Sequence, residues 1–169
     1  DATITINNTG SASNTYGINI NATTGQVNLS DGAILTSNDS GLNNTALNMT
    51  GSGSLNIETD AKMIVNQATT TTRYGVVTVS GSGDIYVANG GELDILATNQ
   101  GTTSTNLIYL AGTAQLSYGK DSIGTLSTDG TGINNGVYAS GSSKVFIYRV
   151  GSLTINLNQS TTGSKLLYL

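Results

Sequence analysis

The sequence of 169 residues contains no cysteine, no histidine, no proline and no tryptophan. The absence of cysteine excludes disulfides, thiolate metal sites and cysteine nucleophiles. The absence of histidine removes the usual general base and the most common metal ligand. We therefore predict no catalytic residue, no metal site and no cofactor for this chain.

Charge is also scarce. Asp, Glu, Lys and Arg make up 9% of the residues, against roughly 25% in an ordinary soluble domain. The net charge is −4, and the six basic residues are scattered without a run, so nucleic-acid binding is not predicted. No apolar stretch approaches the ~20 residues that a membrane-spanning helix needs, so we expect no membrane span in this segment.

What the sequence does contain is a repeat of about 30 residues. Gly/Ser/Thr-rich turns open at Thr23, Gly51, Gly81, Gly112 and Gly141, and each turn leads into a short apolar strand. The spacings are 28, 30, 31 and 29 residues, a period that is typical of stacked repeat architectures. The expected coils are residues 1–22, 23–50, 51–80, 81–111, 112–140 and 141–169.

Each repeat holds three short segments in which apolar and polar residues alternate. In residues 51–80 they are Leu55-Asn56-Ile57, Met63-Ile64-Val65 and Val77-Thr78-Val79. Alternation with a period of two predicts half-buried strands. The predicted fold is all-β, a single right-handed parallel β-helix of about five to six coils with three strands per coil. An antiparallel sandwich is the structural alternative.

Two groups of aromatic residues are candidate binding sites. A column on the third strand of each coil reads Asn19, Asn48, Thr78, Tyr109, Tyr138 and Tyr168. Its tyrosines have apolar or small neighbours along the strand, so they should point outward and form a ladder that suits a sugar ring or a protein surface. Stacking that merely stabilises the sheet is the alternative. The second group, on and beside the first strand, is Tyr86, Phe146 and Tyr148.

Long polar arches follow the second strand of each coil, at residues 38–45, 67–73, 98–105, 128–135 and 158–163. Their Asn, Ser, Thr and Gln side chains offer neutral donors and acceptors for carbohydrate hydroxyls. The same side chains can form ladders that stabilise turns and coil stacking. Both roles are compatible.

The acidic residues do not align into a catalytic pair. Asp84 aligns with Gln26, Ser54, Gln115 and Lys144, and Asp94 aligns with Thr5, Ile64, Gly124 and Thr154. Polysaccharide cleavage needs paired acids, or an acid cluster that holds Ca²⁺ beside a base. A non-enzymatic role is therefore predicted. The alternatives are a polysaccharide lyase or hydrolase, and a self-assembling or ice-binding solenoid.

The segments VNLSDGAILTSNDS, GSGSLNIETDAKMIV and GSGDIYVANGGELDIL resemble the pectate-lyase-like adhesive domains of Gram-positive cell-surface proteins. These include lactobacillal-type adhesins and the binding regions of serine-rich repeat adhesins. The resemblance implies display on the surface or wall of a bacterium. It also implies adhesion to host or microbial glycans or to neighbouring cells. Acidic polysaccharides and surface proteins are further expected partners. The chain opens and closes on strand-like patterns, ATITI and KLLYL, so we expect it to be a segment of a longer protein. The sequence has ten acidic side chains and six basic ones, so its net charge passes through zero as the pH falls. We expect the protein to self-associate at acidic pH, where this charge repulsion is lost.

Overall fold

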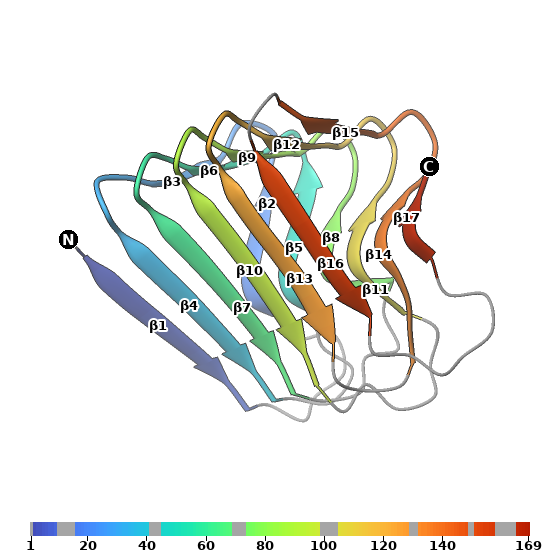
Figure 1. Cartoon of the computed structure of the whole chain (residues 1–169), viewed down its shortest axis with the longest axis horizontal. Helices are drawn as coiled ribbons and strands as arrows, with labels where there is room; N and C mark the ends of the chain where they lie inside the picture. The colour runs from blue at the N-terminus through green and yellow to red at the C-terminus, as the bar shows by residue number, and fades with distance from the viewer. Residues whose placement is uncertain are drawn as a thin grey trace.

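The computed structural model of this chain describes residues 2–9, 16–40, 45–68, 74–98, 105–128, 132–148, 151–157 and 165–169. In these residues the chain forms seventeen strands, which assemble into three parallel sheets (Figure 1). Sheet A contains β1 (Thr3–Asn8), β4 (Ile34–Asp39), β7 (Lys62–Gln67), β10 (Glu92–Ala97), β13 (Ile123–Thr128) and β16 (Ser152–Leu157). Sheet B contains β2 (Tyr16–Ala22), β5 (Thr45–Gly51), β8 (Gly75–Val79), β11 (Thr105–Leu110), β14 (Ile133–Ala139) and β17 (Lys165–Tyr168). Sheet C contains β3 (Gln26–Leu29), β6 (Ser54–Ile57), β9 (Asp84–Val87), β12 (Gln115–Tyr118) and β15 (Lys144–Ile147).

The predicted parallel β-helix with three strands per coil is confirmed. Each coil contributes one strand to each sheet, and every strand pairs with its counterpart one coil along the chain. In Figure 1 the strands of sheet A descend in front, those of sheet B ascend behind them, and the coils advance from left to right. That combination is a right-handed helix, the usual hand of parallel crossover connections.

The alternation that predicted the strands also forms the core. In β6 and β7 the inward residues Leu55, Ile57, Met63 and Val65 are fully buried. The residues that alternate with them within each strand are half-buried. Strands of this length cannot bury their apolar side within one coil. Stacking of coils therefore creates the core, a continuous column of Leu, Ile and Val between the three sheets.

The glycines that open the repeats stack in one turn column. Gly51, Gly81, Gly112 and Gly141 all have positive φ, between 72° and 85°. The turns are joined by backbone hydrogen bonds, such as that from the Ser82 N–H to the Gly51 carbonyl at 2.8 Å. A residue without a Cβ fits this conformation and lets successive turns approach closely.

Asparagine side chains link successive coils on the strands themselves. In each link an amide Nδ2 donates to the Oδ1 of the asparagine one coil away. The pairs are Asn38 with Asn7, Asn66 with Asn38, Asn48 with Asn19, Asn56 with Asn28, and Asn135 with Asn106, at 2.6–2.9 Å. Asparagine ladders therefore connect the coils along the strands. The ladders predicted within the arches fall mostly outside the described residues.

One sequence alignment is wrong by a single residue. Asp94 lies opposite Thr125, whereas Gly124 lies opposite Leu93. Gly124 occupies an inward core position, where the pattern of the other coils places leucine or methionine. The sequence pattern failed there because glycine gives no hydrophobic signal.

Candidate binding groove

The third-strand column has the predicted register throughout. Asn19 pairs with Asn48, Asn48 with Thr78, and Thr78 with Tyr109, and the column continues through Tyr138 to Tyr168. The neighbours Ile108 and Leu110 are fully buried, whereas Tyr109 and Tyr138 are half-buried and Tyr168 is 39% exposed. The tyrosines therefore point outward, as the alternation predicted.

The three rings stack on one another. The ring centroids of Tyr109 and Tyr138 are 5.5 Å apart, and those of Tyr138 and Tyr168 are 4.7 Å apart with nearly parallel planes. The Nζ of Lys165 lies 4.2 Å from the centre of the Tyr168 ring and caps that end of the ladder.

A fourth tyrosine, which the sequence analysis did not single out, extends the ladder at its other end. Tyr74 stacks on Tyr109 with a centroid distance of 4.9 Å and is 68% exposed. Its carbonyl accepts a 2.6 Å hydrogen bond from the Asn106 side chain. The next residue, Gly75, lies so close to Tyr109 that a Cβ would be 3.0 Å from the Tyr109 Cβ. The bare glycine and the Asn106 amide thus hold Tyr74 against the ladder.

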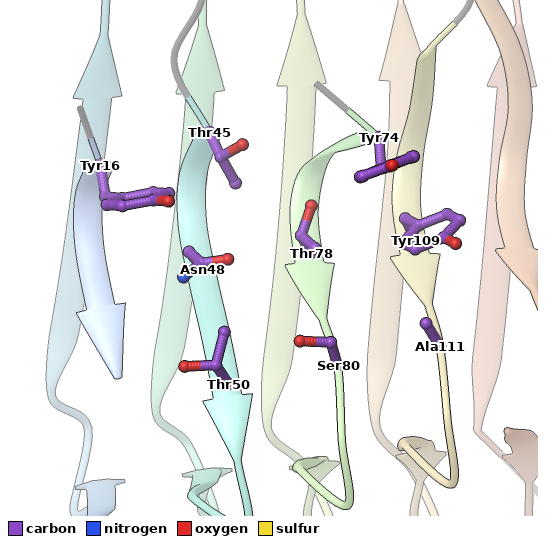
Figure 2. A pocket seen from close by; sticks show the side chains of 9 residues that line it. All are labelled: Tyr16, Thr45, Asn48, Thr50, Tyr74, Thr78, Ser80, Tyr109 and Ala111. Carbon is purple, nitrogen blue, oxygen red and sulfur yellow. The ribbon is translucent and has the colours of Figure 1, made fainter. Parts of the chain in front are cut away.

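Where the ladder stops, the surface of sheet B is hollowed into a groove of about 380 Å³ (Figure 2). Aromatic rings stand at its two ends, Tyr16 from β2 at one and Tyr74 with Tyr109 at the other. The small side chains between them form the floor, and they come from β5, β8 and the residues that follow β8 and β11. The floor residues are Thr45, Asn48, Thr50, Thr78, Ser80 and Ala111. The groove exists because the outward column of sheet B changes from large tyrosine side chains to the smaller asparagine and threonine.

The second aromatic group lies elsewhere on the molecule, on and beside sheet C. Tyr86 and Phe146 share an outward column, separated by Ser117. Phe146 stacks on Tyr148 with a centroid distance of 6.1 Å. Tyr86 is 40% exposed and Tyr148 is 54% exposed, so both rings are accessible. The structure does not bring this group together with the tyrosine ladder, because the two groups lie on different sheets.

Two acidic residues of sheet A, Glu92 and Asp94, are held in ion pairs. The Nζ of Lys62 lies 2.7 Å from a carboxylate oxygen of Glu92 and 2.7 Å from one of Asp94. Burial lowers the pKa of Lys62, but its hydrogen bonds to Asp94 and Glu92 and the negative charges of these carboxylates together raise it by more, so the net pKa lies above its ordinary value. Lys62 is therefore a fixed cation rather than a base. Among the described residues, no three acidic side chains lie close enough together to hold a metal ion.

Asp84 should make the stability of the protein dependent on pH. Burial raises the pKa of its carboxyl above the ordinary value of 3.8, and its buried Oδ1 has no hydrogen-bond partner among the described residues. The folded state therefore binds this proton more tightly than the unfolded chain does. The contribution of Asp84 to the free energy of unfolding is thus unfavourable at neutral pH and becomes less so as the pH falls through the folded pKa.

We expect Asp84→Asn to raise the melting temperature at neutral pH, and the gain to vanish below the ordinary carboxyl pKa. Thermal unfolding monitored by circular dichroism across the acid range measures both effects. The exposed Asp60 provides the control, because Asp60→Asn also removes one carboxylate. Equal gains for the two variants at neutral pH would contradict the assignment to Asp84.

The predicted arches lie mostly outside the described residues, although the structure does place several of their boundary residues on strands. Asn38 and Asp39 end β4, Thr45 begins β5, and Gln67 ends β7.

In the described parts of the chain, no helix has the length and apolar character needed to cross a membrane. No family model, curated protein or solved structure matches the chain.

Proposed function

We propose that this β-helix is a glycan-binding module of a bacterial surface adhesin. The observation that carries the proposal is the groove on sheet B, which combines tyrosine rings at its ends with a floor of uncharged amide and hydroxyl groups. Sugars present apolar faces that stack on aromatic rings and hydroxyls that hydrogen-bond to neutral polar groups. A groove of this composition suits a carbohydrate better than an apolar ligand.

The bacterial surface enters the proposal through the sequence resemblance to adhesive domains. The fold is compatible with that role, because a solenoid holds most of the groove residues on paired strands. Tyr74 is fixed by Asn106, which in turn accepts a 2.6 Å hydrogen bond from Asn135. Binding to such a prearranged surface loses little conformational entropy. Several modules on one cell would then add their weak affinities through multivalency.

Tyr74→Ala tests the proposal. We expect this variant to bind a glycan ligand about tenfold more weakly, which corresponds to ~1.4 kcal/mol, the upper end of an aromatic stacking contribution. Tyr74 is the most suitable position because its ring is the most exposed of the ladder and lines the groove. A glycan array identifies ligands, and isothermal titration then compares affinities.

Tyr148→Ala is the matched control, since this tyrosine is also exposed but lies outside the groove. Tyr138→Ala separates the groove from the ladder, because Tyr138 stacks on Tyr109 without lining the groove. We expect little loss of affinity in either control. Glycan binding that is equally weakened in Tyr74→Ala and Tyr148→Ala would contradict a site at this groove.

A further inference from the structure

We infer that the groove selects neutral, hydroxyl-rich glycan chains and rejects carboxylated ones, an inference that rests on the proposed function and narrows it. The sequence left neutral and acidic glycans open as ligands. The charges and hydrogen bonds of the groove distinguish between them.

The groove offers no cation to an acidic sugar. None of its nine described lining residues is charged. The protein as a whole is negative, with a net charge of −4, so a polyanion also meets long-range repulsion at neutral pH. Recognition of a carboxylate normally uses an arginine or lysine, or several converging N–H donors.

The floor of the groove directs most of its hydrogen-bond donors into the protein. The Asn48 Nδ2 donates to Asn19 at 2.9 Å, and the Thr50 hydroxyl donates to the Asn21 Oδ1 at 2.8 Å. The hydroxyls of Thr78 and Ser80 point at backbone carbonyls at 3.4 Å.

Oxygen lone pairs are what the floor presents to a ligand. Figure 2 shows the side-chain oxygen of Asn48 directed toward β8, away from Asn19, to which its Nδ2 donates. The hydroxyl oxygens of Thr50, Thr78 and Ser80 also retain acceptor capacity. An acceptor-rich floor binds groups that donate hydrogen bonds, such as sugar hydroxyls. A carboxylate, which can only accept, meets no cation there and finds few donors, namely the second N–H of Asn48 and the hydroxyls of Tyr74 and Tyr109.

The dimensions of the groove favour a short chain over a single sugar. Tyr16 lies on β2 and Tyr109 on β11, three strand spacings away in sheet B. At the usual spacing between strands this is about 14 Å. The ligand would run along the helix axis, across β5 and β8, with a tyrosine at each end.

The experiment compares neutral oligosaccharides with uronic-acid counterparts of the same linkage, on one array and at neutral pH. The pairs are cello- and galacto-oligosaccharides and the corresponding glucuronates and galacturonates. We expect a neutral member to bind at least about tenfold more tightly than its uronate, with little dependence on salt. That binding should be weakened by Tyr74→Ala.

A change of floor charge provides the converse test. Thr78→Lys places a cation in the floor and should raise uronate binding about tenfold, in a salt-sensitive way. Thr78→Gln controls for side-chain size and should not. Arg73 precedes Tyr74 in the sequence and lies outside the described residues, so the comparison is repeated with Arg73→Gln, which should keep the neutral preference.

The outcomes separate the inference from the proposed function. Uronate binding that equals or exceeds neutral binding, and that Tyr74→Ala weakens, would overturn the neutral selectivity but leave a glycan-binding groove. Failure of Thr78→Lys to raise uronate binding would also overturn the selectivity argument. Absence of binding to every member of every pair would overturn the proposed function, and the inference with it.

Discussion

Gly124→Leu is expected to destabilise the protein by about 3 kcal/mol, and adding Tyr118→Val to the same chain is expected to restore most of that loss. The prediction concerns two core positions on neighbouring sheets. Tyr118 ends β12 on sheet C, and Gly124 lies in β13 on sheet A.

The two residues compensate for each other in size. Tyr118 is completely buried and occupies a column position filled by Val87 in the previous coil and Ile147 in the next. Gly124 occupies a column position filled by Leu93 and Leu153. A Cβ at Gly124 would lie 2.5 Å from the Cε1 of the Tyr118 ring. The ring therefore fills the space that a leucine fills in the other coils.

Each single substitution should therefore destabilise the protein for a different reason. Gly124→Leu overpacks the core against the ring. Tyr118→Val leaves a cavity, and loss of a large buried side chain costs about 3–5 kcal/mol. The double variant rebuilds the arrangement of the neighbouring coils. Urea unfolding of all four chains gives the coupling free energy, which we expect to reach about 5 kcal/mol or more, the sum of the two single losses less the small loss of the double variant.

Tyr118→Phe is the control for the buried hydroxyl. The Tyr118 hydroxyl has no hydrogen-bond partner among the described residues, and burial raises its pKa well above the ordinary value. Its removal should stabilise the protein by up to about 1 kcal/mol, because an unpaired buried polar group is unfavourable. The substitution should not rescue Gly124→Leu, because the ring atoms remain. Additive losses in the Gly124→Leu and Tyr118→Val double variant would show that the two positions are independent.

The sequence predicted the fold because a β-helix repeats its local signals. Four coils open with the same turn glycine and the alternation recurs in every coil, so an error in one coil is corrected by the others. The register of Tyr109, Tyr138 and Tyr168 followed directly from this repetition. Gly124 is the position at which the repeating signal is interrupted. The inward Gly124 breaks the apolar pattern, and only Tyr118, in a different sheet, explains why a glycine can lie there.

The groove could not be predicted in the same way. Tyr74 does not belong to the repeating column, since the register position in its coil is Thr78. It reaches the ladder from the residue before β8, where Gly75 allows a close approach to Tyr109. Periodicity shows which residues align, but it does not report a residue that joins a column from a strand end. The dipeptide Tyr74-Gly75 at the end of a polar arch was the available signal.

Gly81→Ala is expected to destabilise the protein by about 3 kcal/mol. A non-glycine residue at the φ of 82° costs about 1–2 kcal/mol by itself. The new Cβ would also lie 2.6 Å from the Gly51 carbonyl oxygen, which accepts a hydrogen bond from the Ser82 N–H. Displacing that carbonyl weakens the bond between two coils, which contributes about 1 kcal/mol. Urea unfolding followed by circular dichroism measures the change.

Gly141→Ala separates the two causes of this loss. Gly141 has a similar φ of 72°, but a Cβ there would lie 3.1 Å from the Gly112 carbonyl oxygen. Both variants carry the backbone penalty, and only Gly81→Ala adds a severe clash between coils. We therefore expect Gly141→Ala to be destabilised by about 1–2 kcal/mol, less than Gly81→Ala. Equal losses would mean that the backbone conformation alone requires glycine in this column. A larger loss for Gly81→Ala would mean that close stacking of the turns requires it as well.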